Sequence, residues 1–152
     1  MTLSLVLAPD PILRQICAPL NFAEGAWGEV AFEMLRVMYQ AKGRGLAAPQ
    51  VGLNVRLFVM DSQWKSACPI PRVFCNPEIV VASERLVTQE EGCLSLPDQP
   101  MPVARPAWVR MRWQDLGGAW HDARFEGFEA ACVQHERDHL DGILITDYEA
   151  AA

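Results

Sequence analysis

Two of the three histidines in the chain lie four residues apart, in the motif HERDH at residues 135–139. Residues at positions i and i+4 of a helix lie one turn apart on the same face, so both imidazoles can bind one metal ion. Glu136 follows His135 directly and can accept a proton from a water molecule that the metal activates. The alternative is a surface helix that carries two histidines by chance. The spacing favours a metal-dependent hydrolase.

A catalytic metal site of this kind needs a third protein ligand. The sequence downstream resembles that of the metzincin proteinases only as far as Gly142, because the position of their third histidine is occupied by Ile145. We therefore expect the third ligand upstream of the motif. The candidates are His121 and the five cysteines, which are Cys17, Cys68, Cys75, Cys93 and Cys132.

The cysteines are odd in number and show no CxxC spacing, which indicates reduced thiols in a reducing compartment. Cys93 differs from the others because acidic and glycine residues precede it, in EEGCLSL at residues 90–96. We expect the other four cysteines to be small buried hydrophobic residues.

Three motifs together resemble those of the peptide deformylase family, GxGxAAxQ, EGCxS and HExDH. The chain carries GRGLAAPQ at residues 43–50, EGCLS at 91–95 and HERDH at 135–139, in that order. The resemblance extends to PDPILR at 9–14, Asn76-Pro77 and LDG at 140–142, and so spans nearly the whole chain. It implies a metal-dependent hydrolase that removes the formyl group from N-formylmethionyl peptides of newly made proteins and releases formate.

The resemblance also implies the metal ligands, which are Cys93, His135 and His139 here. It implies one divalent ion per chain, Fe²⁺ in the first place, with Zn²⁺ or Ni²⁺ as substitutes. The fourth coordination position stays open for water.

By the same resemblance, Glu136 transfers protons, first from water and then to the departing amine. The side-chain amide of Gln50 and the backbone N–H of Leu94 donate hydrogen bonds to the oxyanion. Gln50 as an ordinary loop-capping amide is the alternative for that residue.

The substrate side of the site is expected to include Gly45, Arg44 and Glu91. The backbone of Gly45 would pair with the peptide as an added strand. Glu91 would also form an ion pair with Arg105 that steadies the loop of Cys93. Arg44 occupies a position that is usually aliphatic beside the methionine pocket, and it can point to solvent, pair with an acid such as Glu91, or meet the substrate.

Further departures from the family pattern lie around the same pocket, at Gln89, Phe128 and Ala131, and Pro100 stands past the EGCLS loop where many members of the family carry a basic residue. They support a second interpretation, a deformylase-like hydrolase with altered acyl-peptide specificity. A third is a metal-binding relative that has lost turnover. The third interpretation is disfavoured, because a protein that no longer catalyses a reaction is free to lose its active-site residues. In this chain all of them are intact.

The order of the predicted elements, a helix, several antiparallel strands and a second helix, indicates an α+β fold with an N-terminal amphipathic helix. The resemblance implies antiparallel sheets packed around the C-terminal metal-binding helix. Periodicity predicts helices over residues 24–42, ending at Gly43, and 127–141, ending at Gly142. Strands are predicted at 55–60, 72–81, 85–89, 108–114 and 119–125, with a hairpin turn at Gly117-Gly118. Asp10 is expected to cap a short turn that carries Ile12 and Leu13.

Composition sets the broad class. The 152 residues, 51% of them hydrophobic, suit one catalytic domain over 1–152, and the net charge of −6 argues against a DNA-binding or membrane-surface protein. We expect a cytoplasmic protein with an N-formyl peptide substrate. The residues after His139 include Asp141, Asp147 and Glu149 and no basic residue, so ribosome contact is expected to be weak.

Overall fold

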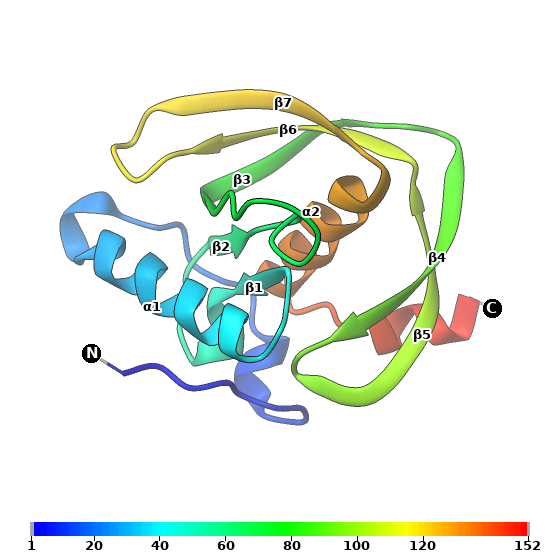
Figure 1. The fold of residues 1–152 in the computed structure, drawn as a ribbon, viewed down its shortest axis with the longest axis horizontal. Coiled ribbons are helices and arrows are strands. Elements are labelled where there is room, and N and C mark those ends of the chain that lie inside the picture. Colours follow the sequence, from blue (N-terminus) through cyan, green and yellow to red (C-terminus); the bar gives the residue numbers. More distant parts are fainter. Residues whose placement is uncertain (1, 152) are drawn as a thin grey trace.

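The computed structural model describes the backbone of residues 2–151 and the side chains of residues 2–148, and it shows an α+β architecture with two antiparallel sheets (Figure 1). The larger sheet has the strand order β1-β2-β3-β6-β7. Its strands are β1 (Gly45–Ala47), β2 (Leu57–Met60), β3 (Arg72–Ala82), β6 (Trp108–Gln114) and β7 (Trp120–Glu126). The smaller sheet is the hairpin of β4 (Leu86–Cys93) and β5 (Leu96–Pro106).

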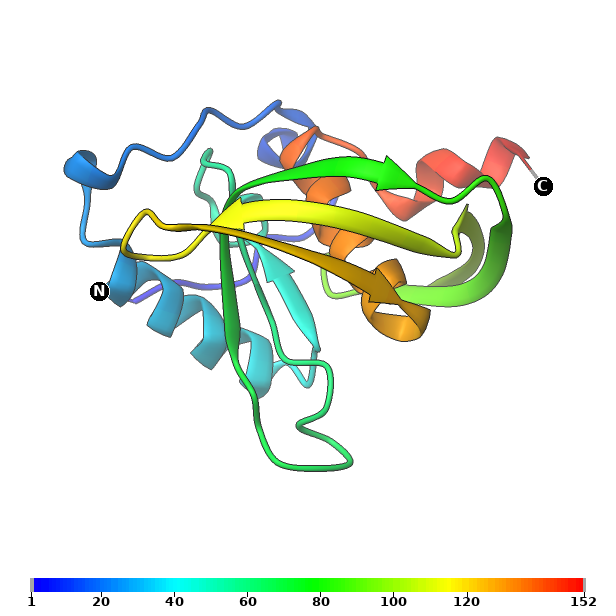
Figure 2. The ribbon, with the colours of Figure 1, turned by 90° about the horizontal axis from the view of Figure 1, so that it is seen from above.

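Two α-helices pack on opposite faces of the larger sheet, and Figure 2 shows them on either side of its strands. They are α1 (Trp27–Gln40) and α2 (Gly127–Leu140). Successive residues of a strand point to opposite faces. Leu57 and Val59 of β2 accordingly pack with α1, whereas Phe58 and Met60 pack with α2. The sheet therefore holds α2 against a fully buried strand, which fixes the helix that carries the histidine motif.

The β4–β5 hairpin is anchored by the two ends of the chain. Its Cys93 and Val103 share an apolar cluster with Leu13, from the short 3₁₀ helix Pro11–Arg14, and with Ile145, from the 3₁₀ helix Ile145–Ala151. The side chain of Asp10 caps the first of these, accepting a hydrogen bond from the Ile12 N–H at 3.0 Å, as the sequence predicts. Both termini thus stabilise the hairpin that ends at Cys93.

Several element boundaries differ from the sequence-based predictions. The first helix begins at Trp27 rather than at residue 24, because residues Phe22–Glu24 form a separate 3₁₀ turn capped by Asn21. Lys42, not Gly43, adopts the left-handed conformation after the helix, with φ of 62°. Gly43 instead packs closely against Leu94, since a Cβ there would lie 2.6 Å from Cδ1 of that side chain.

Two strands were not predicted. β1 has only three residues, and β5 contains Pro97, Pro100, Pro102 and Pro106. Prolines argue against a central strand but are tolerated where the missing N–H faces away from the partner strand. In the two-stranded sheet of β4 and β5 each strand has one unpaired edge, so a missing N–H can face away from the partner on either strand. The second helix, its stop at Gly142 and the hairpin turn at Gly117-Gly118 are confirmed. No helix among the described residues is long and apolar enough to cross a membrane.

Candidate metal centre and active site

Three possible ligand atoms converge where the end of β4 meets α2. Nε2 of His139 lies 3.2 Å from Nε2 of His135 and 3.6 Å from Sγ of Cys93, and all three atoms lie within 4.8 Å of one another. The two imidazoles come from successive turns of α2, whereas the thiol comes from the hairpin. The fold thus joins Cys93, rather than His121, to the histidine pair.

These separations suit a tetrahedral metal ion. With metal–nitrogen distances of about 2.05 Å and a metal–sulfur distance of about 2.3 Å, tetrahedral angles require about 3.3 Å between nitrogens and about 3.6 Å between nitrogen and sulfur. The observed distances of 3.2 Å and 3.6 Å agree with both. Three protein ligands leave one coordination position for water or substrate, as in catalytic rather than structural sites.

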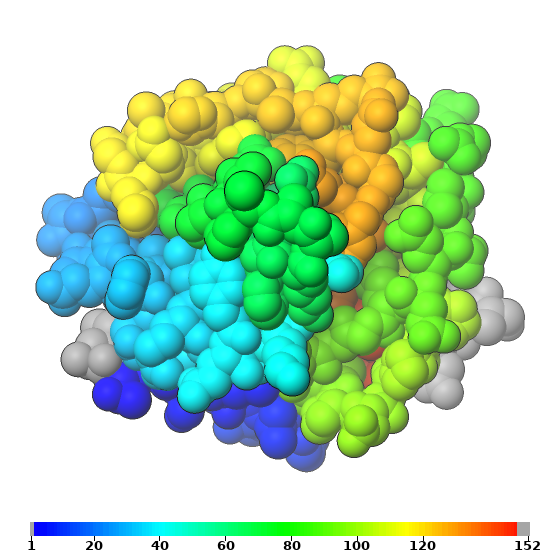
Figure 3. All heavy atoms as spheres, in the orientation of Figure 1, coloured from blue at the N-terminus to red at the C-terminus, as the bar shows by residue number. Residues whose placement is uncertain are grey.

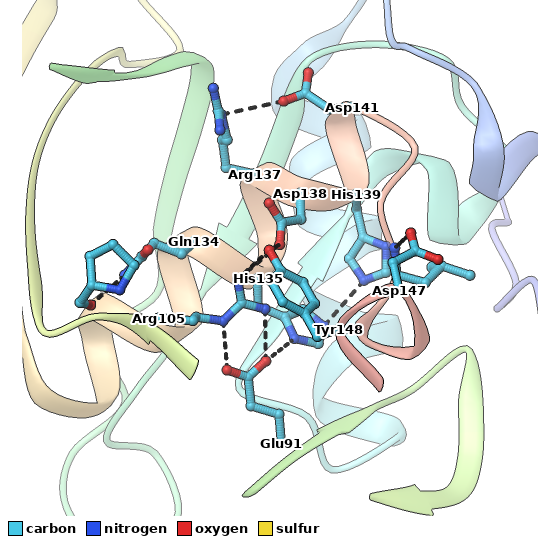
Figure 4. A network of polar contacts seen from close by, with 12 residues as sticks. Glu91, Arg105, Gln134, His135, Arg137, Asp138, His139, Asp141, Asp147 and Tyr148 are labelled. Atoms are coloured by element: carbon cyan, nitrogen blue, oxygen red, sulfur yellow. Dashed lines mark hydrogen bonds and ion pairs between the residues drawn. The ribbon is translucent and has the colours of Figure 1, made fainter. Parts of the chain in front are cut away.

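Glu91 orients the first of the histidines (Figure 4). Its Oε1 lies 3.0 Å from Nδ1 of His135, and the carboxylate also accepts two hydrogen bonds from Arg105, at 2.6 Å from Nε and 2.9 Å from Nη2. Burial acts to raise the pKa of Glu91, but the hydrogen bonds from Arg105 and His135 outweigh it and hold the pKa below its ordinary value. The ionised carboxylate therefore fixes His135 with Nδ1 as donor and Nε2 free for a metal.

A second carboxylate holds Arg105 from the opposite side. Nη1 of Arg105 donates to Oδ2 of Asp138 at 2.8 Å, and the hydroxyl of Tyr148 donates to the same oxygen at 2.6 Å (Figure 4). Sequence reasoning missed both Asp138 and Tyr148. The signal for Asp138 was its place inside the HERDH motif, three residues after His135. Tyr148 gave no comparable signal, because its contact with Arg105 depends on where the C-terminal turn packs.

The two imidazoles differ in basicity. Burial acts to lower the pKa of His135, but the acidic groups of Glu136, Cys93 and Glu91 outweigh it and raise the pKa to about 10. Burial and the neighbouring charge of His135 both lower the pKa of His139. A metal ion must therefore displace a proton from His135, since a ligand imidazole is neutral at its coordinating nitrogen.

Glu136 places a carboxylate beside the ligands. Its side chain is buried, Oε1 has no hydrogen-bond partner within the described residues, and burial raises the pKa of this carboxyl to about 7. The carboxylate lies against Gly45, where a Cβ atom would be only 2.6 Å from Oε2 of Glu136 and 2.9 Å from Sγ of Cys132. Glycine is therefore required at residue 45 by close approach, and it leaves the carboxylate accessible from the cavity.

Gln50 is oriented by hydrogen bonds on both ends of its amide. Its Oε1 accepts from the Ala47 N–H at 3.0 Å, and its Nε2 donates to Oγ of Ser95 at 3.0 Å while lying 3.7 Å from Sγ of Cys93. Ser95 in turn donates to the carbonyl of Val6 at 2.7 Å. Sequence reasoning also missed Ser95, although it is the last residue of the EGCLS motif and links two of the three motifs.

A cavity of about 630 Å³ opens beside these groups, between β1 and the β4–β5 hairpin, and Figure 3 shows the surface hollowed there. Its lining includes Gly45, Gln50, Leu94 and Glu136. β1 is an edge strand of the larger sheet, so one side of it is available for pairing with an extended peptide. The cavity therefore offers strand pairing next to the ligand cluster.

The structure also shows which candidates lie elsewhere. His121 lies on β7, stacked on Trp113 and 2.7 Å from Asp115, with its side chain exposed. Cys68 is exposed, so the prediction that it is buried was wrong, because the loop between β2 and β3 extends away from the core. The expected burial of Cys17, Cys75 and Cys132 is confirmed, and all five cysteines are free.

Glu91 and Arg44 were both expected on the substrate side of the site, and the structure gives them different contacts. Glu91 lines the cavity, but its carboxylate is occupied by Arg105 and His135. The predicted Glu91–Arg105 ion pair is confirmed at 2.6 Å. Arg44 does not pair with Glu91. Its guanidinium lies 4.9 Å from the ring centroid of Phe128, at the wall of the cavity.

Comparison with known proteins shows similarity along the whole chain. The family model described as polypeptide deformylase matches residues 2–151. A peptide deformylase of Mesorhizobium japonicum is 44% identical, over 95% of this chain and 82% of that protein, and one of Rhizorhabdus wittichii is 46% identical, over 97% and 87%. The crystal structure of peptide deformylase from Thermotoga maritima is similar, with a TM-score of 0.90, 34% identity and 97% of each chain covered. So is a probable peptide deformylase from synechococcus phage S-SSM7, with a TM-score of 0.91, 37% identity and 97% and 99% covered.

Proposed function

The chain belongs to the peptide deformylase family, and on that basis we propose a role for each residue around its cavity. It is an enzyme that removes the formyl group from N-formyl peptides, as the family match and relatives 40–46% identical over at least 95% of the chain support. The family is metal-dependent, and the chain carries a matching site of one cysteine and two histidines.

Cys93, His135 and His139 hold the metal in this proposal. The support is the agreement of their spacing with tetrahedral coordination, together with the carboxylate of Glu91 behind His135. When bound, the cation supplies Lewis acidity, which lowers the pKa of water towards about 7 and polarises a carbonyl group. We propose Fe²⁺ as the ion. Zn²⁺ and Ni²⁺ suit the same sulfur and imidazole donors.

Glu136 is proposed as the proton carrier of the reaction. Its unpartnered Oε1 can accept a proton from the attacking water and later deliver it to the amine that leaves. The side chain is held between α2 and the β1 backbone, so the carboxylate needs no rearrangement to stay beside the reacting groups. Metal binding and proton transfer are thereby assigned to neighbouring residues of one helix.

Gln50 and Leu94 are proposed to stabilise the oxyanion that forms on the formyl oxygen. The amide of Gln50 is oriented by the Ala47 N–H and by Ser95, which leaves its second N–H directed towards the ligand cluster. Leu94 directly follows Cys93 at the tip of the hairpin and lines the cavity, so its backbone N–H is close to the same place. Donors held in position before the reaction are the effective ones.

The peptide is proposed to bind as a strand added to the edge of β1, beside Gly45. Newly made chains with a formylated N-terminus are the proposed physiological substrate, and the free cysteines fit a reducing compartment such as the cytoplasm. Weak contact with the ribosome stays a prediction.

The observation that carries these assignments is the convergence of three ligand atoms next to a buried, unpartnered carboxylate. The test is formate release from formyl-Met-Ala-Ser by protein loaded with iron or nickel in the absence of oxygen. Glu136→Gln should keep its metal and lose about 10²–10⁴-fold in kcat. Glu129→Gln, two turns earlier in α2 and bonded to Ser62, is the control and should keep both. Undiminished turnover in Glu136→Gln would remove this residue from the mechanism.

A further inference from the structure

Arg44 places a permanent cation in the wall of the substrate cavity. Its guanidinium lies 4.9 Å from the centroid of the Phe128 ring, and both residues line the cavity. Phe128 lies seven residues, or two helical turns, before His135 in α2, so it shares a helix face with that ligand. The guanidinium is therefore fixed along the same face of α2 that leads to the reacting groups.

The guanidinium is not satisfied within the protein. Nε of Arg44 is buried without a hydrogen-bond partner, and Arg44 forms no ion pair with a carboxylate in the part of the chain that the structure describes. A guanidinium cannot lose its charge, and a buried donor without a partner is costly. Of the three fates considered from the sequence, pairing with Glu91 is excluded, because Arg105 holds that carboxylate. Pointing to solvent is met only in part, because Nε is buried and the half-buried side chain forms part of the cavity wall.

The charges around Arg44 leave this wall cationic. Lys42 and Lys65 also line the cavity, and burial, followed by the like charges of Arg44 and Lys42, lowers the pKa of Lys65. The acidic residues that line the cavity are either exposed on the hairpin or already in contact with other groups of the protein. Glu90 and Asp98 are exposed on the hairpin, while Glu91 is neutralised by Arg105 and Glu136 lies against Gly45. No carboxylate of the cavity lining pairs with Arg44, so an acceptor on a bound substrate can replace water as its partner.

The position of Arg44 matches the side chain of the formylated residue. The formyl group must lie beside His135 and Glu136, and two helical turns separate His135 from Phe128, a span of about 11 Å. Ala131 and Cys132 lie between them, on the intermediate turn, and both line the cavity with small side chains. A substrate side chain that extends along this face therefore runs towards the guanidinium, whose residue directly precedes Gly45 beside Glu136.

We propose that Arg44 is a specificity-determining residue, which favours N-formyl peptides whose first side chain ends in an oxygen acceptor. This inference rests on the proposed function and names its substrate class. Two chemical sources supply such an oxygen. One is a formylated residue with a carboxylate side chain. The other is formylmethionine after oxidation to the sulfoxide, which replaces a weakly accepting thioether by a polar oxygen. A guanidinium donates to either oxygen.

The test compares kcat/KM for three peptides, formyl-Met-Ala-Ser, formyl-Met(sulfoxide)-Ala-Ser and formyl-Glu-Ala-Ser. In Arg44→Ile, the ratio of each oxygen-bearing peptide to formyl-Met-Ala-Ser should fall about tenfold below the wild-type ratio. Arg110→Ile removes an exposed cation on β6, outside the cavity, and should leave both ratios unchanged. A fall for one oxygen-bearing peptide alone identifies which source Arg44 recognises.

A binding measurement separates this inference from the proposed function. Titration calorimetry of the product peptides Met(sulfoxide)-Ala-Ser, Glu-Ala-Ser and Met-Ala-Ser should show the same loss of preference in Arg44→Ile, with no turnover involved. Failure of the wild-type protein to hydrolyse formyl-Met-Ala-Ser would contradict the proposed function and leave the binding result interpretable. Unchanged ratios in Arg44→Ile, or an equal shift in Arg110→Ile, would overturn the assignment of Arg44.

Discussion

Oε1 of Glu91 lies 3.0 Å from Nδ1 of His135, so the hairpin that supplies the thiol is bonded directly to the helix that supplies both imidazoles. Glu91 precedes Cys93 by two residues on the same strand. Arg105, on the partner strand, holds the carboxylate through two hydrogen bonds and reaches Asp138 of α2. The thiol of Cys93 and the imidazole of His135 are thus held on segments that this ion-paired network joins.

This network predicts a metal-affinity defect in Glu91→Gln. The amide keeps the size of the side chain but loses the charge that fixes His135, so affinity should fall about 10–100-fold. Competition with a coloured chelator measures the change. Glu84→Gln, an exposed acid before the same strand, is the control and should release metal like the wild type. Equal affinities in both variants would mean that His135 is oriented by the fold alone.

Gly45→Ala should impair turnover while leaving the metal in place. The new Cβ would lie 2.6 Å from Oε2 of Glu136 and 2.9 Å from Sγ of Cys132, closer than atoms pack, so the carboxylate must shift. We expect kcat/KM for formyl-Met-Ala-Ser to fall at least tenfold, an effect of about 1.4 kcal/mol. Gly28→Ala is the matched control, because a Cβ there meets nothing within 4 Å. Full activity in Gly45→Ala would show that Glu136 tolerates displacement.

The ion pair of Arg14 and Asp147 predicts a pH-dependent contribution to stability. Their side chains are 2.7 Å apart. The hydrogen bond from Arg14 is the largest of the effects that act on the pKa of Asp147, and it lowers this pKa. A carboxyl whose folded pKa is depressed stabilises the fold above its unfolded pKa of about 3.9, and this stabilisation is lost as the pH falls through the lower folded pKa.

Asp147→Asn should therefore lower the free energy of unfolding at pH 7, by no more than about 1 kcal/mol because the pair is solvent-exposed. The difference from the wild type should vanish in strongly acidic buffer. Urea unfolding at several pH values provides the measurement, with Asp98→Asn, an exposed acid on β5, as the control. A difference that persists at low pH would assign the effect to something other than the ionised pair.

The sequence predicted the parts of the site that depend on local spacing. Two histidines four residues apart share a helix face in any regular helix, and α2 begins and ends where its glycines indicate. The third ligand could not be chosen by spacing, because Cys93 reaches α2 through the packing of a separate hairpin. The resemblance of the motifs supplied that assignment, and the distances of the structure agree with it.

Contacts between distant segments account for what the sequence did not predict. Asp138 meets Arg105 only once α2 packs against β5, and Tyr148 only once the C-terminal turn does. The strand β5 was not predicted because it contains four prolines. A proline disrupts strand pairing only where its missing N–H would have faced the partner strand. The left-handed residue after α1 is Lys42 rather than Gly43, and Gly43 instead packs closely against Leu94.

The metal content of two cysteine variants tests the central claim most directly. Cys93 and Cys17 are both buried free thiols, but only Cys93 lies within reach of the histidine pair. After anaerobic loading with iron and removal of free ions, Cys93→Ala should contain almost no metal, whereas Cys17→Ala should retain about one ion per chain. Equal metal content in the two variants would contradict the assignment of Cys93 as a ligand.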